Sequence, residues 1–171
     1  MKVLLFMAMS LNGLIADEQG KEDFLSNVNW ACFCELAQEK GGFVIGRKTY
    51  EIVSHFYEGF GFDDLSGVKI IVSSDSKYAA PEGYLHAMSP QDAIKLAEDH
   101  GLASLLLTGG ALLNSHFLKE ELVDEVLINV EPVLIGKGKN LVAPVLEKLR
   151  MRLVECSPLS RGVVQLRYAM D

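Results

Sequence analysis

The stretch "FVIGRKTYEI", residues 43–52, joins a β-forming run to the start of a helix through a single glycine. Read from Gly41, it lies one residue away from the G-x-x-x-x-G-K-[ST] pattern of a phosphate-binding P-loop. The residues between the glycines of a P-loop form a loop whose amides face phosphate, whereas the apolar triplet at 43–45 favours a strand. The pattern therefore predicts a strand up to Gly46 and a helix from residue 47.

The start of this helix is a candidate anion site. Unpaired amides and the positive end of the helix dipole attract anions, and adjacent cations strengthen the attraction. Arg47 and Lys48 supply the cations, Thr49 adds a hydroxyl, and Gly46 lets a ligand approach the backbone.

Two further strand ends carry similar chemistry. Thr108, Gly109 and Gly110 join the apolar "ASLLL" to a helical pattern at 111–122, and Ser73 and Ser74 follow "VKIIV". Since the carboxyl ends of parallel strands share one edge of a sheet, the three turns predict one extended phosphate-bearing ligand such as a dinucleotide. Backbone requirements of a tight turn are the alternative explanation of the Gly-Gly pair.

Strands and helices alternate along the first two thirds of the chain, and alternating apolar and polar residues follow. Ser89, Pro90 and Asp92 form a helix start with a capping box. Residues 158–162 are predicted to form a turn between the last two strands. We expect one α/β domain over residues 1–171, with three layers: a mostly parallel central sheet, flanking helices and a C-terminal antiparallel hairpin.

Composition excludes several classes of function. The 171 residues carry a net charge of −7, which gives no general attraction to nucleic acid or to an acidic membrane. The apolar N-terminal run is too short to span a bilayer, and it favours a buried strand. Three cysteines and four histidines lack metal-ligand spacing, so we expect no metal and reduced thiols in a cytoplasmic protein.

Three motifs carry a resemblance to a known family. They are "AMSLNGLIAD" at 8–17, "GRKTYE" at 46–51 and the long Gly-Gly stretch at 105–138. Together they resemble the dihydrofolate reductase-like superfamily, in the branch of the riboflavin-biosynthesis reductase, which forms the C-terminal domain of a bacterial bifunctional deaminase-reductase. Small single-domain members are the most similar. The resemblance implies a dihydrofolate reductase-like fold.

The resemblance also implies NADPH as the cofactor. By position, Ala8, Leu14 and Ile15 would line the nicotinamide pocket. The phosphates would be held by two sets of residues, namely Gly46, Arg47, Lys48 and Thr49, and Thr108, Gly109, Gly110 and Ala111. Arg47 and Ser74 would lie near the adenosine 2′-phosphate. Leu112 stands where dihydrofolate reductases often have Arg, so NADH remains an alternative.

Two departures from the family pattern concern the proton donor. Trp30 occupies the place of the acidic residue of dihydrofolate reductases, and Asn12 that of the signature Asp. An amide keeps the hydrogen-bonding shape but cannot act as an acid. Asp17, Glu18 and Asp23 are the candidate replacements, and Asp23 ranks first because "GKEDFL" resembles a motif of the small relatives. A solvated loop carboxylate or a helix cap is the alternative for Asp23, in which case water would supply the proton.

These observations predict an NADPH-dependent reductase that transfers a hydride to a small heterocycle, either a pyrimidine of riboflavin biosynthesis or a pteridine. Asn12 and Asp23 are the candidate catalytic residues, and Ser10 and Trp30 the candidate substrate contacts. The alternatives are a non-catalytic nucleotide-binding module and a divergent dihydrofolate reductase. Relatives often pair through the region of "VEPVLIG", which implies a homodimer.

Overall fold

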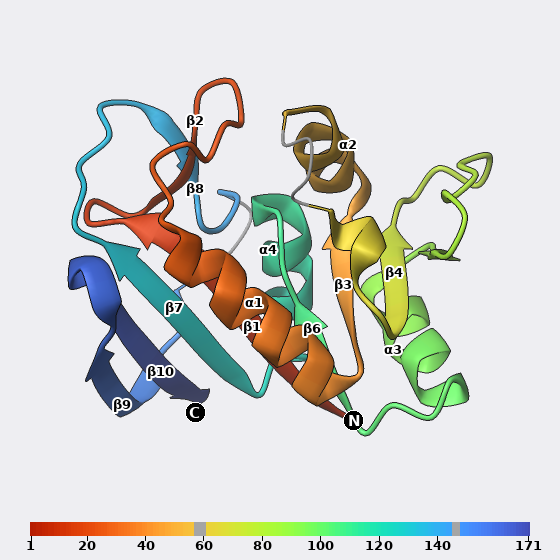
Figure 1. Cartoon of the computed structure of the whole chain (residues 1–171). Helices are drawn as coiled ribbons and strands as arrows, with labels where there is room; N and C mark the ends of the chain where they lie inside the picture. Colours follow the sequence, from red (N-terminus) through yellow and green to blue (C-terminus); the bar gives the residue numbers. More distant parts are fainter. Residues whose placement is uncertain (57–60, 145–147) are drawn as a thin grey trace.

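An eight-stranded mixed sheet forms the centre of the computed structural model, which describes residues 1–56, 61–144 and 148–171 (Figure 1). The strand order is β5-β4-β3-β6-β1-β7-β10-β9. Its strands are β1 (Lys2–Ser10), β3 (Gly42–Gly46), β4 (Val68–Val72), β5 (Leu85–Ala87), β6 (Ser104–Leu107), β7 (Glu125–Glu131), β9 (Met151–Pro158) and β10 (Val164–Met170). A separate pair joins β2 (Leu14–Asp17) to β8 (Gly138–Asn140).

The strands run parallel in the first part of the chain and antiparallel at its C-terminal end, as the sequence predicted. Neighbouring strands from β5 to β7 run parallel, whereas β10 is antiparallel to both β7 and β9. The short helix η2 (Ser160–Gly162) lies in the turn between β9 and β10. The predicted α/β class, mostly parallel sheet and C-terminal hairpin are therefore confirmed.

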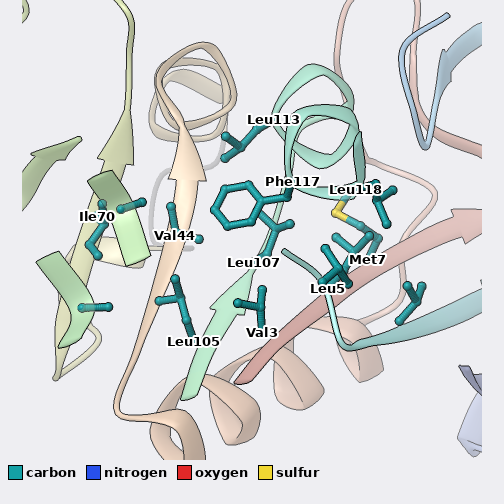
Figure 2. Close-up of a cluster of buried hydrophobic side chains, with 14 of the residues drawn as sticks. Val3, Leu5, Met7, Val44, Ile70, Leu105, Leu107, Leu113, Phe117 and Leu118 are labelled. Atoms are coloured by element: carbon teal, nitrogen blue, oxygen red, sulfur yellow. The ribbon is translucent and has the colours of Figure 1, made fainter. Parts of the chain in front are cut away.

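Helices cover both faces of the sheet, so the central strands are buried on two sides. Helix α1 (Asn27–Lys40) lies on one face, and α3 (Pro90–Asp99) and α4 (Ala111–Lys119) lie on the other (Figure 1). Figure 2 shows Leu107 beside Phe117 of α4, and Leu5 beside Met7 in the same cluster. The alternate residues Leu4 and Phe6 pack in the second cluster, beneath α1. This double burial explains why β1 is apolar throughout.

Helix boundaries agree with the local signals, with small differences. Helix α1 begins at Asn27 rather than at Trp30, and Gly41 ends it in a left-handed conformation with φ 77°. Ser89 Oγ accepts a hydrogen bond from the Asp92 amide at 3.1 Å, as a cap should. Helix α4 ends before the predicted residue 122, since Glu121 adopts φ 55°. The short strands β2, β5 and β8 carry no clear pattern in the sequence and were not predicted.

The described residues form neither a membrane-spanning helix nor a cluster of metal-ligating side chains. None of the helices they form combines the length and apolar character needed to cross a membrane. Nor do these residues bring three or more His, Cys, Asp or Glu side chains together as a metal site requires.

Candidate functional site

The turns after β3 and β6 lie against each other at the carboxyl edge of the sheet. The amide of Gly46 donates to the carbonyl of Gly109 at 2.8 Å. A Cβ atom on Gly110 would lie 2.5 Å from Thr49 Oγ1, so the contact between the turns requires glycine there. The Gly109–Gly110 peptide bond is cis. Residues 42–46 form a strand, which confirms that this is not a P-loop.

The helices that follow these turns begin in a way that suits an anion. Helix α2 (Arg47–Phe56) and helix α4 have no acidic residue in their first turns. Among the described residues no side chain caps the start of α4. Their first amides and dipole ends therefore face the edge of the sheet without a competing carboxylate on the same helix turn. Such helix starts could hold the phosphates of a dinucleotide, which stays a prediction from the sequence.

Arg47 connects this edge to the turn after β4. Its Nη1 atom lies 3.4 Å from Asp75 Oδ2, and its Nε atom lies 3.6 Å from Glu51 Oε1. The Asp75 amide in turn donates to Ser73 Oγ at 3.3 Å, and Ser74 is exposed. The structure thus brings Arg47 to the Ser73–Asp75 turn, where the guanidinium faces two carboxylates. An added phosphate there would compete with Asp75 for Arg47.

A pocket of about 360 Å³ opens beside these turns. It is bounded by β1, the segment before α1, the first half of α1, α2 and the short helix η1 (Phe62–Asp64). Its lining residues are Phe6, Met7, Ala8, Glu22, Asp23, Leu25, Ser26, Asn27, Asn29, Trp30, Phe33, Thr49, Val53, Phe62 and Thr108. The aromatic side chains form one wall: the ring centroid of Trp30 lies 5.5 Å from that of Phe33 and 5.9 Å from that of Phe62.

The pocket contains five of the residues predicted from the sequence: Ala8, Asp23, Trp30, Thr49 and Thr108. Two others, Leu14 and Ile15, are buried on β2 outside the lining. Ile15 packs in the main hydrophobic cluster. Lys48 is exposed on the first turn of α2.

Ser10 and Asn12 also lie outside the pocket lining, where they shape a turn. Ser10 Oγ donates to Asn12 Oδ1 at 2.9 Å and accepts from the Leu14 amide at 3.0 Å. Asn12 Nδ2 donates to the Ile135 carbonyl at 2.7 Å, and its Oδ1 accepts from the Ile135 amide at 3.1 Å. An Asn side chain can donate a hydrogen bond to this carbonyl, whereas an ionised Asp can only accept one. The structure therefore explains why Asn suits position 12 better than Asp.

A buried polar network supports the base of the pocket. Glu131 of β7 is 4% exposed, and its Oε1 accepts hydrogen bonds from Ser26 and from Asn29 Nδ2. Asn129 Nδ2 donates to Asn29 Oδ1 at 2.9 Å, and Gln165 Nε2 donates to Asn129 Oδ1 at 2.9 Å. The network therefore ties the start of α1 to β7 and β10.

Comparison with known proteins identifies the family. A model of the RibD C-terminal domain family matches residues 1–165. The chain belongs to the RibD C-terminal domain family. A curated relative is YwjB, an uncharacterized protein of Bacillus subtilis (strain 168), which is 28% identical over 170 residues, 98% of this chain and 97% of YwjB.

Solved structures support the same assignment for this RibD C-terminal domain. A putative riboflavin biosynthesis protein from Shewanella sp. PV-4 has a TM-score of 0.81 and 26% identity, with 100% of this chain and 99% of that chain covered. Dihydrofolate reductase from Enterococcus faecalis, in complex with NADP(H), has a TM-score of 0.73 and 15% identity over 99% of this chain and 96% of that chain. The predicted dihydrofolate reductase-like fold is thereby confirmed.

Within this RibD C-terminal domain, the structure singles out a carboxyl group that the sequence did not. Glu22 and Asp23 both line the pocket, but Asp23 is exposed and Glu22 is partly buried. Desolvation by burial raises the pKa of Glu22 from 4.5 to about 7. The motif "GKEDFL" presents the two carboxylates side by side, and only the fold distinguishes them.

Proposed function

We propose that the chain is an NADPH-dependent reductase that transfers a hydride to a small heterocycle, either a pyrimidine of riboflavin biosynthesis or a pteridine. One observation carries the proposal: Thr49 and Thr108 belong both to the pocket lining and to the turns that suit the dinucleotide phosphates. The pocket is therefore continuous with the anion site. Membership of a reductase domain family supports the same conclusion.

Different residues at the sheet edge would bind different parts of the cofactor. The turn at residues 46–49 and the turn at residues 108–111 would hold the phosphates through backbone amides. Arg47 would bind the adenosine 2′-phosphate, which is the group that separates NADPH from NADH. Bound NADPH supplies the hydride. The side chains of the pocket then hold the substrate, and its apolar walls exclude water.

The pocket has the size and chemistry for a flat heterocycle. Its volume of about 360 Å³ lies at the lower end of the range for small-molecule sites. Trp30, Phe33 and Phe62 give a planar ring an aromatic surface to pack against. Ser26 and Asn27 add hydroxyl and amide groups that can bind ring nitrogens and carbonyl oxygens.

The first experiment is a titration of the purified protein with NADPH and with NADH, followed by nicotinamide fluorescence and repeated with Arg47→Ala. Micromolar NADPH binding that weakens in the variant supports the cofactor assignment. Absorbance assays with pyrimidines and pteridines, dihydrofolate among them, then test for turnover. Binding without any turnover would favour a nucleotide-binding module, and turnover of dihydrofolate alone a divergent dihydrofolate reductase. Absence of binding at millimolar nucleotide would refute the proposal.

We also propose a homodimer, as the resemblance to paired relatives implies. Apolar side chains are exposed in the predicted region, where Leu134 is 71% exposed. They are also exposed on the edge strand β9, where Leu153 is 52% and Val154 is 51% exposed. Sedimentation velocity should show twice the monomer mass for the wild type. A monomer at tens of micromolar would contradict the proposal.

A further inference from the structure

We propose that Glu22 is the proton donor of the reaction, in the role that the sequence predicted for Asp23. The inference rests on the proposed reductase function and assigns one of its steps to a residue. It stands on the position of Glu22 in the pocket, on the way its backbone is held, and on its surroundings.

The backbone on each side of Glu22 is anchored by hydrogen bonds. Asp17 Oδ1 accepts from the amide of Lys21 at 2.8 Å, and the amide of Asp17 donates to the Lys21 carbonyl at 2.9 Å. The amide of Leu25 donates to the Glu22 carbonyl at 2.9 Å. The following residue, Ser26, is bound to the buried Glu131. Glu22 thus enters the pocket from a segment fixed to β2 on one side and to β7 on the other.

The described residues that line the pocket around Glu22 are mostly uncharged. Among the described lining residues, Asp23 is the other one with a carboxyl group, and β1, α1, α2 and η1 contribute apolar, hydroxyl or amide side chains. Two cations lie near its segment: Lys21 is the preceding residue, and Lys139 Nζ of β8 lies 3.1 Å from where a Cβ of Gly20 would be. Burial in the pocket removes the carboxylate of Glu22 from water, and this desolvation raises its pKa to about 7.

A carboxyl group with these properties is suited to donate a proton near neutral pH. The substrate carbon of a C=N or C=O bond accepts the hydride and its electron pair, and the nicotinamide is oxidised. The π bond breaks, and its electrons form a new N–H or O–H bond with the proton of Glu22. Glu22 is left as a carboxylate and regains its proton from water, so the cycle is balanced.

The ionisation of Glu22 can be measured without turnover, because Trp30 is the only tryptophan of the chain and lines the same pocket. Tryptophan fluorescence of the ligand-free protein should titrate with a midpoint near the pKa of Glu22, about 7. Glu22→Gln should remove this transition, and Asp23→Asn should retain it. A transition that survives in Glu22→Gln, or that is lost in Asp23→Asn instead, would overturn the inference.

Turnover supplies the second readout. The kcat of the wild type should fall as the pH rises through about 7, since the acid form is then lost. Glu22→Gln should lower kcat roughly 100-fold or more while leaving the affinity for NADPH unchanged. Glu35→Gln on the exposed face of α1 is the matched control. Wild-type kcat in Glu22→Gln would overturn this inference alone, whereas absence of NADPH binding would overturn the proposed function with it.

Discussion

Ser26 donates both its backbone N–H and its hydroxyl to the same oxygen of Glu131, at 2.7 and 2.6 Å. The two residues are 105 positions apart in the chain, and their contact fastens the start of α1 to β7. Since Ser26 also lines the pocket, one buried carboxylate determines where this part of the pocket wall lies.

Replacing Glu131 should therefore destabilise the protein. Glu131→Ala leaves the buried donors of Ser26 and Asn29 without their acceptor, so the free energy of unfolding should fall by about 3 kcal/mol. Urea denaturation measures the change. Glu82→Ala at an exposed position away from β9 is the control and should change the free energy by less than about 0.5 kcal/mol. Equal effects of the two variants would show that the network contributes no stability.

Gly110→Ala should disturb the contact between the two turns proposed to bind the cofactor phosphates. The new Cβ would lie 2.5 Å from Thr49 Oγ1, and we expect a loss of about 1–3 kcal/mol in unfolding free energy together with weaker nucleotide binding. Thr49→Ala in the same chain should restore the stability, because the clashing atom is removed. Gly136→Ala, which meets nothing within 4 Å, is the control. If the double variant is no more stable than Gly110→Ala, the clash is not the cause.

The ion pair between Arg47 and Asp75 predicts opposite effects of two substitutions on cofactor preference. Arg47→Ala should weaken NADPH binding about tenfold or more and NADH binding much less, because a charge-assisted contact to the 2′-phosphate is lost. Asp75→Asn should strengthen NADPH binding a few-fold, since a competing carboxylate is removed. Arg152→Ala on β9 controls for net charge. Equal losses for the two nucleotides in Arg47→Ala would place the 2′-phosphate elsewhere.

Restoring the signature aspartate should cost stability without adding activity. Asn12→Asp places a carboxylate oxygen against the Ile135 carbonyl, where Nδ2 now donates at 2.7 Å, and we expect a loss of about 0.5–1.5 kcal/mol in unfolding free energy. Thermal denaturation measures it, and Asn140→Asp on exposed β8 is the control. An increase in kcat for Asn12→Asp would instead show that position 12 takes part in proton transfer.

The raised pKa of Glu22 predicts a pH dependence of stability. Between pH 4.5 and about 7 the folded state holds a proton that the unfolded state has released. The free energy of unfolding should therefore fall as the pH rises through this window, by roughly 3 kcal/mol, and level off above it. Glu22→Gln should lack this component and be the more stable protein at about pH 8. Parallel curves for the two proteins would contradict the assignment.

Much of the fold could be predicted because its signals are local. The apolar run of β1, the cap at Ser89 and the left-handed Gly41 each depend on a few neighbouring residues. The positions of the strand-to-helix turns followed from the same patterns, and with them the candidate cofactor residues. The short strands β2, β5 and β8 were missed because three or four residues carry too little periodicity.

The sequence by itself determined the order of the elements and the absence of the expected acids at positions 12 and 30. It also determined that glycines, hydroxyl groups and cations follow the parallel strands. Only the tertiary structure decided that Asn12 binds a backbone 123 residues away, and that Glu22 is partly buried whereas Asp23 is exposed. The physical reason is that desolvation depends on every group packed around a side chain. For Glu22 those groups come from distant strands and helices, so adjacent carboxylates acquire different chemistry only when the chain has folded.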